Sequence, residues 1–342
     1  MADTSFSVDI GEKFTRIADA TLKSKKIDIT SLGEELTVAN FFSDEMEKTM
    51  ELQAEVMSKM TKDLKIVKKN INVVIPDSYC YAQVIEFSKL NEKELLSAVR
   101  YQADQFIPLP IDKVIFDLEV VKENSTTKKN TILVVASPKK LVERIEKTIE
   151  LAGFIPESLE SELSAITRYF SDLCVYAEAQ PTSYLIINFS YSTTSLYLIT
   201  MPGGVLSELR IIKTGFDLFI KELKFNLELQ DNKAMELLES VGFEKNGTYD
   251  LATFAGPLLR DLMNEMMKFV AIAQDKYQLP VSKVYLCNFD NRVHALDKKL
   301  SELIKIPVES ILMRDILINN PVSQSFSTKM SSFISSISAN IR

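Results

Sequence analysis

Hydrophobic and polar residues alternate over short runs at the start of the chain, a pattern typical of β-strands. The first run, Phe6–Ile10, is followed by Gly11 and then by a second run, Phe14–Ala20. This order predicts a strand, a tight turn and a second strand that pairs with the first. A third strand is expected at Ile27–Leu32, so the chain is predicted to open with a small sheet.

Helical spacing replaces this alternation between Ser43 and Lys69. Apolar residues there recur three or four positions apart, which predicts a helix whose N-terminal cap lies near Ser43. The recurring residues are Met46, Met50, Val56, Met57, Met60 and Leu64. Methionines at this spacing form a core face or a ligand groove, and we expect a core face. A short strand at Ile71–Ile75 follows and ends at Pro76.

A compact unit of helix and strand is predicted next. The patterns follow one another in the order strand, helix, strand, strand, helix. The predicted elements are Gln83–Phe87, Glu92–Phe106, Val114–Val121, Thr131–Ala136 and Lys139–Ala152. A polar run from residue 122 to 130 joins the two adjacent strands, and we interpret it as the solvated tip of a hairpin.

The second half of the chain repeats the opening order of strands. A helix is expected from Ser161 to about Tyr176, and the AEAQPTS stretch after it is interpreted as a linker. Strands and glycine-containing turns then alternate, helices dominate from Asp217 to Tyr277, and a last strand precedes a final helix. The strands are Tyr184–Phe189, Thr194–Thr200, Val205–Lys213 and Lys283–Cys287, and the final helix is Ser327–Ile341. This repetition indicates an internal duplication.

Composition and charge exclude several classes of protein. The chain has 342 residues, of which 46% are hydrophobic and 25% are charged, so it can bury at least two cores. Its net charge of −7 argues against a nucleic-acid-binding surface. No run approaches the roughly 18 uncharged apolar residues of a membrane helix, and the N-terminus lacks a signal-peptide pattern. We therefore expect a cytoplasmic protein.

Cysteine and histidine are too sparse for a metal site or a disulfide framework. The three cysteines, Cys80, Cys174 and Cys287, lie far apart in the sequence, and His294 is its single histidine. The chain contains no CxxC pair and no context for a catalytic Cys–His pair. We predict no metal ion and no catalytic residue.

Several segments resemble the PilM family of type IV pilus assembly proteins. They are FSVDIGEKFTRIAD, KLNEKELLSAVRYQADQFIPLPIDKVIFDLEVV, ILVVASPKKLVERIEKTIELAGFIPESLESELSAITRYF, LIINFSYSTTSLYLIT and FSTKMSSFISSISANIR. The resemblance covers essentially the whole chain in the family's order. It implies an α/β protein of the actin-like class, with two duplicated ribonuclease H-like lobes and a small βαββα subdomain like that of the division protein FtsA.

The resemblance also implies a division of the chain. Residues 1–81 would form the N-terminal part of the first lobe, 82–154 the inserted subdomain, and 155–180 a helix that completes the first lobe, with the linker. Residues 181–225 and 281–325 would form the core of the second lobe, with a helical subdomain at 226–280. The C-terminal helix, 326–342, would return to the first lobe.

In the PilM family, a cleft between the subdomain and the first lobe receives the short cytoplasmic N-terminal segment of the membrane protein PilN. The resemblance therefore implies a partner groove in this chain, because an extended peptide needs apolar pockets beside free backbone groups. Candidate groove residues are Tyr101, Phe106, Ile107, Pro108, Leu109 and Pro110. The alternative is that these are core and turn residues.

An actin-like fold also implies a nucleotide site between the lobes. Two hairpin turns surround the phosphates in such a site, and a glycine-rich turn holds the adenosine. The first hairpin is present in Asp9 and Gly11. However, Glu12 and Lys13 replace the small residues usually found next, and they crowd the place where backbone should meet phosphate.

The other nucleotide elements depart from the pattern. Asn188 and Ser190 stand where the second hairpin should carry Asp and Gly, and Asn288 replaces a glycine of the adenosine turn. Gly215 alone remains of a glycine pair, whereas Glu162 matches an acidic position that can orient metal or water. These residues would contact a nucleotide if one bound, but we expect neither ATP nor magnesium as a cofactor.

These features favour an interaction scaffold rather than an enzyme. The resemblance implies a protein at the inner face of the cell membrane, held there by partners or by a tether outside this sequence. It would bind a PilN-type segment and link it to the pilus motor or the inner-membrane platform. The alternative is an active ATPase whose nucleotide state gates partner binding.

Two further functions are considered, a sugar kinase and a homodimer. A sugar kinase of the same superfold would need a catalytic Asp in a glycine-rich setting near the cleft, and we find none. The amphipathic helix Leu258–Tyr277 could form a homodimer face, although we expect a core face.

Overall fold

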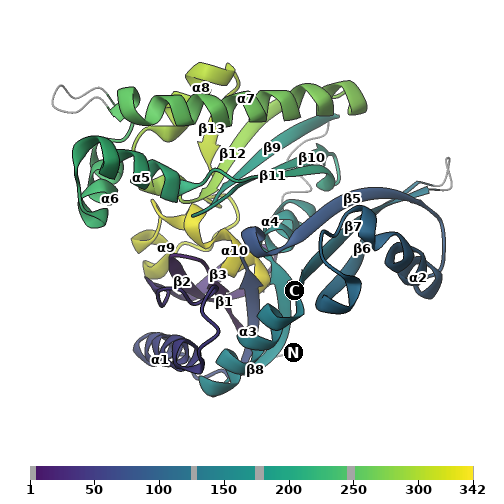
Figure 1. The fold of residues 1–342 in the computed structure, drawn as a ribbon, viewed down its shortest axis with the longest axis horizontal. Coiled ribbons are helices and arrows are strands. Elements are labelled where there is room, and N and C mark those ends of the chain that lie inside the picture. The colour runs from purple at the N-terminus through teal and green to yellow at the C-terminus, as the bar shows by residue number, and fades with distance from the viewer. Residues whose placement is uncertain (1–4, 125–128, 174–180, 245–250, 342) are drawn as a thin grey trace.

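The computed structural model describes residues 5–124, 129–173, 181–244 and 251–341. The chain forms two lobes, each built on a five-stranded mixed sheet, and a small three-stranded sheet stands beside the first lobe (Figure 1). In Figure 1 the second lobe lies above the first, and the small sheet lies to the right of both. The predicted α/β fold with two lobes is confirmed.

The sheet of the first lobe has the strand order β3-β2-β1-β4-β8. Strands β1 to β3 pair antiparallel, whereas β4 pairs parallel with both β1 and β8. The strands are β1 Ser5–Ile10, β2 Phe14–Lys23, β3 Lys26–Leu36, β4 Asn70–Ile75 and β8 Ile155–Ser161. Buried residues of this sheet, such as Phe6, Val8 and Ile71, form one core with helices α1 (Glu47–Asp63) and α3 (Lys139–Leu151).

The sheet of the second lobe repeats this order as β11-β10-β9-β12-β13. The strand directions also match, because β9 to β11 pair antiparallel and β12 pairs parallel with both β9 and β13. The strands are β9 Thr182–Phe189, β10 Thr194–Met201, β11 Val205–Ile212, β12 Val281–Asn288 and β13 Val308–Ser310. The predicted duplication is therefore present strand by strand.

Four helices accompany the second sheet. They are α5 Phe216–Leu227, α6 Asp231–Ser240, α7 Leu251–Tyr277 and α8 Leu296–Ile304. Leu259, Leu262 and Met266 of α7 are buried in the core of this lobe, as expected for a core face. None of the helices within the described residues combines the length and apolarity needed to cross a bilayer.

The small sheet has the order β5-β7-β6 and carries helix α2 on its outer side. Its elements are β5 Tyr81–Ser88, α2 Glu92–Gln102, β6 Val114–Asn124 and β7 Lys129–Pro138. Asn91 and Glu94 form a capping box that fixes the start of α2. The predicted element order is correct, but the helix ends at Gln102 rather than at Phe106, since a 3₁₀ turn and a proline-containing loop follow.

Helix α3 is the last element of the predicted subdomain at 82–154, but it packs in the first lobe. Its buried residues Leu141, Val142, Ile145 and Ile149 share a core with β1 and β4. An amphipathic pattern predicts the buried face of a helix, but it does not say which sheet that face covers. Of the predicted unit, strands β5 to β7 form a sheet of their own.

The predicted helix at Ser43–Lys69 is shorter in the structure. Helix α1 begins at Glu47, and its N-cap, Met46, makes no side-chain cap. Met50, Met57 and Met60 are buried, so the methionine face is a core face, although Met46 itself is exposed. The expected cap near Ser43 is wrong because residues 39–43 form a turn, in which the backbone N–H groups of Ser43 and Asp44 donate to the carbonyl oxygen of Asn40.

The C-terminal segment lies between the two lobes (Figure 1). It contains α9 (Pro321–Ser325), a 3₁₀ turn at Met330–Phe333 and α10 (Ile334–Ala339). The last two stand where a single helix was predicted over Ser327–Ile341. Helix α10 packs against β1, β2, β4 and α4, which spans Glu162–Arg168. The end of the predicted helix 161–176 and most of the predicted linker lie outside the described residues, as does part of the predicted hairpin tip.

Candidate functional site

The first predicted hairpin, between β1 and β2, is a tight turn. The backbone N–H of Gly11 donates to the carbonyl oxygen of Phe14 at 3.0 Å. A Cβ atom at residue 11 would lie 2.6 Å from that oxygen, so the turn cannot close around a larger residue. The geometry of the hairpin thus explains Gly11 without a ligand.

Asp9 lies at the end of β1 and is fully buried. Its Oδ2 accepts a hydrogen bond of 2.6 Å from the hydroxyl of Ser335 in α10 and lies 3.9 Å from Arg16 Nη1. Its Oδ1 accepts no hydrogen bond from the described residues. Burial raises the pKa of Asp9, and the nearby Arg16 guanidinium offsets part of that effect.

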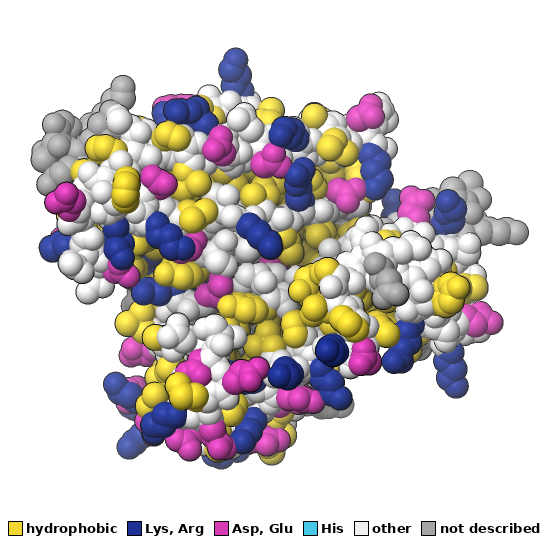
Figure 2. Space-filling view, viewed as in Figure 1, with side chains coloured by type: hydrophobic (Ala, Val, Ile, Leu, Met, Phe, Trp, Pro, Cys, Tyr) yellow, Lys and Arg dark blue, Asp and Glu magenta, His cyan; other side chains and the backbone are white. Residues whose placement is uncertain are grey.

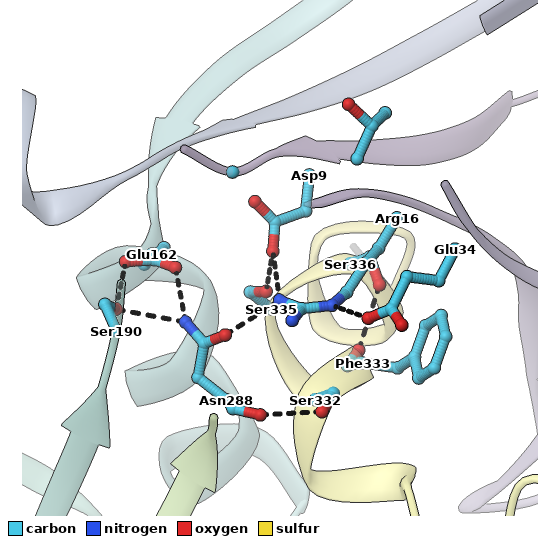
Figure 3. Close-up of polar contacts among 12 residues, drawn as sticks. Asp9, Arg16, Glu34, Glu162, Ser190, Asn288, Ser332, Phe333, Ser335 and Ser336 are labelled. Atoms are coloured by element: carbon cyan, nitrogen blue, oxygen red, sulfur yellow. Dashed lines mark hydrogen bonds and ion pairs between the residues drawn. The ribbon is translucent and has the colours of Figure 1, made fainter. Parts of the chain in front are cut away.

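Glu162, at the start of α4, is the centre of a buried polar network (Figure 3). Its Oε2 accepts hydrogen bonds from the Asn188 amide at 3.0 Å and from the Ser190 hydroxyl at 3.1 Å. Its Oε1 accepts a hydrogen bond of 2.9 Å from the Asn288 amide, whose nitrogen also lies 3.0 Å from Ser190 Oγ. The two asparagines and the serine therefore satisfy one buried carboxylate.

Arg16 of β2 connects this network to the first lobe and was not among the predicted site residues. Its Nη1 donates to Asn288 Oδ1 at 2.7 Å, and its Nε donates to Glu34 Oε2 at 2.8 Å. Its guanidinium carbon lies 5.4 Å from the ring centre of Phe289, and the side chain is almost fully buried. An arginine inside the apolar run of a strand was the sequence signal that could have identified it.

Asp77 and Tyr197 close the network behind Glu162 and were also missed. The Tyr197 hydroxyl donates to Asp77 Oδ2, and the backbone N–H of Leu163 donates to Asp77 Oδ1 at 3.0 Å. Burial raises the pKa of Asp77 and raises that of Glu162 well above its usual value. The neighbouring Asp77 charge raises the pKa of Glu162 further. The cluster buries three carboxyl groups, those of Asp9, Asp77 and Glu162, beside the guanidinium of Arg16.

Gly215, at the start of α5, serves close backbone packing. A Cβ atom there would lie 2.4 Å from the carbonyl oxygen of Tyr191, in the turn between β9 and β10. The backbone N–H of Phe216 donates to the carbonyl oxygen of Ser190 at 3.0 Å, which fixes the helix on that turn. Gly215 thus brings α5 onto the second hairpin.

The seven predicted nucleotide residues are brought together at the lobe interface, but they do not fit a nucleotide with magnesium. The amide of Asn188 already donates to Glu162. Asn288 fills the predicted adenosine turn with a side chain bonded to Glu162 and Arg16 of the first lobe and to Ser190 of the second. Among the described residues, no group of three His, Cys, Asp or Glu side chains is arranged to hold a metal ion. The side chains of Asn188, Ser190 and Asn288 are paired with Glu162, whereas Asp9 Oδ1 accepts no hydrogen bond from the described residues.

A separate apolar cavity of about 230 Å³ lies between the small sheet and the first lobe. It is lined by β6 and β7 of the small sheet and by β8 and α4 of the first lobe. The lining residues are Ile75, Cys80, Ile115–Glu119, Leu133, Val135–Ser137, Val142, Leu159–Ser161, Ser164 and Arg168. Figure 2 shows hydrophobic side chains gathered where the small sheet meets the lobes.

None of the six residues predicted for the partner groove lines this cavity. Tyr101 lies on α2 and is 91% exposed, whereas Ile107 is buried beneath the small sheet. Phe106 and Leu109 are partly buried in the same cluster, and Pro108 and Pro110 are exposed. Tyr101 lines a different, open hollow on α2 together with Lys93 and Ser97. That these six positions form a partner groove stays a prediction.

The chain is similar to known proteins both in sequence and in fold. The family described as type IV pilus assembly protein PilM matches residues 7–333. A solved structure of a PilM–PilN type IV pilus biogenesis complex is similar in fold, with a TM-score of 0.85 at 16% sequence identity, and the match covers 98% of this chain and 97% of that chain.

Two more distant structures match at TM-scores below 0.5. The ethanolamine utilization protein EutJ from Carboxydothermus hydrogenoformans has a TM-score of 0.49 at 10% identity, covering 96% of this chain and 88% of that chain. A Bacteroides thetaiotaomicron protein with an actin-like ATPase fold has a TM-score of 0.46 at 11% identity, covering 95% and 96%. The family match spans nearly the whole sequence, and the chain therefore belongs to the PilM family of type IV pilus assembly proteins.

Proposed function

We propose that this protein is a scaffold of the type IV pilus inner-membrane assembly complex that binds a PilN-type cytoplasmic segment without hydrolysing ATP. The observation that carries the proposal is the cavity lined by β6 and β8, the last strands of their two sheets, and by apolar side chains of β7. The similarity to the PilM of a PilM–PilN complex supports this choice of partner.

Two of the strands that line the cavity, β6 and β8, are edge strands. Strand β6 ends the small sheet and pairs only with β7 among the described residues, and β8 likewise ends the first-lobe sheet and pairs only with β4. An edge strand presents free N–H and C=O groups, to which an extended peptide can add as a further strand. The groove therefore suits an extended segment better than a helix.

Side chains on one face of β6 and β7 would contact alternate residues of such a peptide. Ile115 pairs with Ser137, Asp117 with Val135, and Glu119 with Leu133, and all six line the cavity. The apolar members of this set offer pockets for aliphatic side chains, since residues on one face of a strand recur every second position.

One end of the cavity is acidic. Arg168 forms an ion pair with Glu160, with Nη1 2.9 Å from Oε1, so its charge is already matched. Burial at the cavity wall raises the pKa of Glu119, the Arg168 charge lowers it, and Glu160 raises it further. An additional positive charge would stabilise ionised Glu119, so we expect the partner peptide to place a basic group near this end.

The absence of ATP hydrolysis is part of the proposal. Phosphoryl transfer depends on a metal ion and on groups that stabilise charge on the phosphates. Here, Asn188 and Asn288 are committed to Glu162, and both lobes meet through their side chains. We propose that the protein acts at the inner face of the membrane by linking its membrane partner to the pilus motor or the inner-membrane platform.

The test is isothermal titration calorimetry, in which a synthetic PilN-type N-terminal peptide is titrated into the full chain. ATP with magnesium is titrated in a parallel experiment. Ile115 and Val120 provide a matched pair on β6, being 47% and 44% exposed, but Ile115 alone of the two lines the cavity. We expect Ile115→Asp to weaken peptide binding about tenfold or more, because it places a charge in an apolar contact, and Val120→Asp to leave it within about twofold.

Equal effects of the two substitutions would place the peptide outside the cavity. Saturable binding of ATP with magnesium would refute the nucleotide-independent scaffold and favour an ATPase that gates partner binding. Peptide binding by the wild-type chain with no ATP binding is the result we expect.

A further inference from the structure

The turns that join β1 to β2 and β9 to β10 occupy equivalent positions in the two duplicated sheets and meet at the lobe interface. The Glu12 carboxylate reaches from the first turn to Ser192 in the second. The Ser192 backbone N–H donates to Oε2 at 3.2 Å, and the Ser192 hydroxyl lies 2.9 Å from Oε1 and 2.7 Å from Oε2. The second turn therefore already holds an anion, which the chain itself supplies.

We propose that the β9–β10 turn is an anion-binding site whose resident ligand is the Glu12 carboxylate, and that a phosphate-bearing ligand and Glu12 exclude each other there. A backbone N–H and a hydroxyl in a tight turn are donors of the kind that bind phosphate oxygens. A carboxylate accepts hydrogen bonds without donating, so Glu12 can satisfy both donors at once.

The surroundings of Glu12 make this placement costly. Burial raises the pKa of Glu12, the hydrogen bonds from Ser192 lower it in part, and the nearby Asp217 carboxylate raises it again. A neutral glutamine could also accept the Ser192 N–H, so protein stability does not require the negative charge. The charge does have one direct effect, because it repels any second anion that approaches the same donors.

Glu12 closes one end of the predicted nucleotide site, and Asn288 closes the other. The Asn288 side chain joins Glu162 to Arg16 at the turn where adenosine was expected. The site that an actin-like fold implies is thus filled from both ends by side chains of the protein. This inference goes beyond the proposed function and does not depend on the peptide groove.

Hydrogen–deuterium exchange of the full chain tests the proposal, with inorganic phosphate as the probe. Glu12→Ala removes the resident carboxylate, and we expect the Ser192 amide to exchange about tenfold faster, the factor for losing one hydrogen bond to a charged acceptor. Inorganic phosphate should restore its protection, whereas chloride at the same ionic strength should not. The wild-type chain should not respond to phosphate.

Glu45→Ala is the matched control, since it removes one carboxylate from a fully solvated ion pair with Lys140. It should leave Ser192 exchange unchanged. If the Ser192 amide of the Glu12→Ala variant exchanges at the same rate as in the wild type, Glu12 is not the ligand of the turn. Faster exchange without rescue by phosphate would show that the turn is not an anion site, and either result overturns the proposal.

The Glu12→Ala variant could unfold, in which case all of its backbone amides would exchange rapidly. The Glu12→Gln variant then provides the test. Glutamine preserves the contact with Ser192 but removes the charge, so phosphate should slow Ser192 exchange in this variant and not in the wild type. An equal response of the two proteins to phosphate would overturn the exclusion. None of these outcomes alters the peptide titration, so failure of this inference and failure of the scaffold function can be told apart.

Discussion

Arg16 of β2 and Asn288 of β12 lie in different lobes and are joined by a hydrogen bond of 2.7 Å from guanidinium Nη1 to amide Oδ1. Both side chains are buried, and each has a second hydrogen-bond partner, Glu34 for Arg16 and Glu162 for Asn288. This contact couples the two lobes through polar groups that water cannot replace without opening the interface.

Asn288→Ala should destabilise the protein by about 3 kcal/mol, because it leaves Glu162 Oε1 and Arg16 Nη1 with lost partners in a buried site. Urea unfolding at neutral pH measures the change. Asn226→Ala on the exposed face of α5 is the control and should change stability by less than about 0.5 kcal/mol. Equal effects at the two positions would contradict a coupling role for Asn288.

Arg16→Lys should cost about 1–3 kcal/mol although it keeps the charge. A guanidinium serves Asn288 and Glu34 at once through two separate nitrogens, whereas a single ammonium at the end of a flexible chain cannot match that geometry. The same substitution at exposed Arg100 should be nearly neutral. The two variants are compared by thermal unfolding. If Arg16→Lys leaves stability unchanged, the two-nitrogen geometry of the guanidinium is not required.

Gly215→Ala and Gly256→Ala should change stability in opposite directions. The added Cβ at residue 215 would lie 2.4 Å from a backbone oxygen, so we expect a loss of about 1–3 kcal/mol. At residue 256, inside α7, the nearest atom would be at 3.5 Å, and alanine should stabilise the helix by about 0.5–1 kcal/mol. A stabilising effect at residue 215 would show that α5 does not pack tightly on the second hairpin.

Glu12→Gln should stabilise the protein increasingly as pH rises. Burial raises the folded-state pKa of Glu12 above its ordinary value of 4.5, so the ionised form is disfavoured in the folded protein. The contribution of Glu12 to stability is therefore fully present below about pH 4.5 and is lost as pH rises through the folded pKa. The difference in unfolding free energy between variant and wild type, measured by urea titration from pH 4 to 8, should grow over that window.

Glu47→Gln is the control of opposite sign for this pH series. The hydrogen bond from Lys147 lowers the pKa of exposed Glu47, so its contribution is present above its ordinary pKa and is lost as pH falls. This variant should lose stability at neutral pH relative to the wild type, with the difference disappearing in acid. Parallel pH profiles for the two variants would contradict the assigned environments.

Periodicity alone predicted most strands and the duplicated order of the two sheets. Phe6–Ile10 was predicted from alternating apolar and polar residues, although its polar residues Ser7 and Asp9 are buried too, whereas Tyr184–Phe189 was predicted from a nearly continuous apolar run. Predictions at element ends were less accurate, as for α1 and α2, because caps and 3₁₀ turns depend on a few local hydrogen bonds. The resemblance to the PilM family added the two-lobed arrangement, which local patterns do not contain.

The sequence by itself determined the element order, the hairpin glycines and the departures from a nucleotide-binding pattern at Glu12, Asn188 and Asn288. Only the tertiary structure decided that Arg16, Asp77 and Tyr197 join these residues, that Glu12 reaches Ser192, and that the apolar cavity lies between β6 and β8. The physical reason is that these contacts join residues far apart in the chain. Their distances are set by how the two lobes and the small sheet pack, which short-range periodicity does not encode.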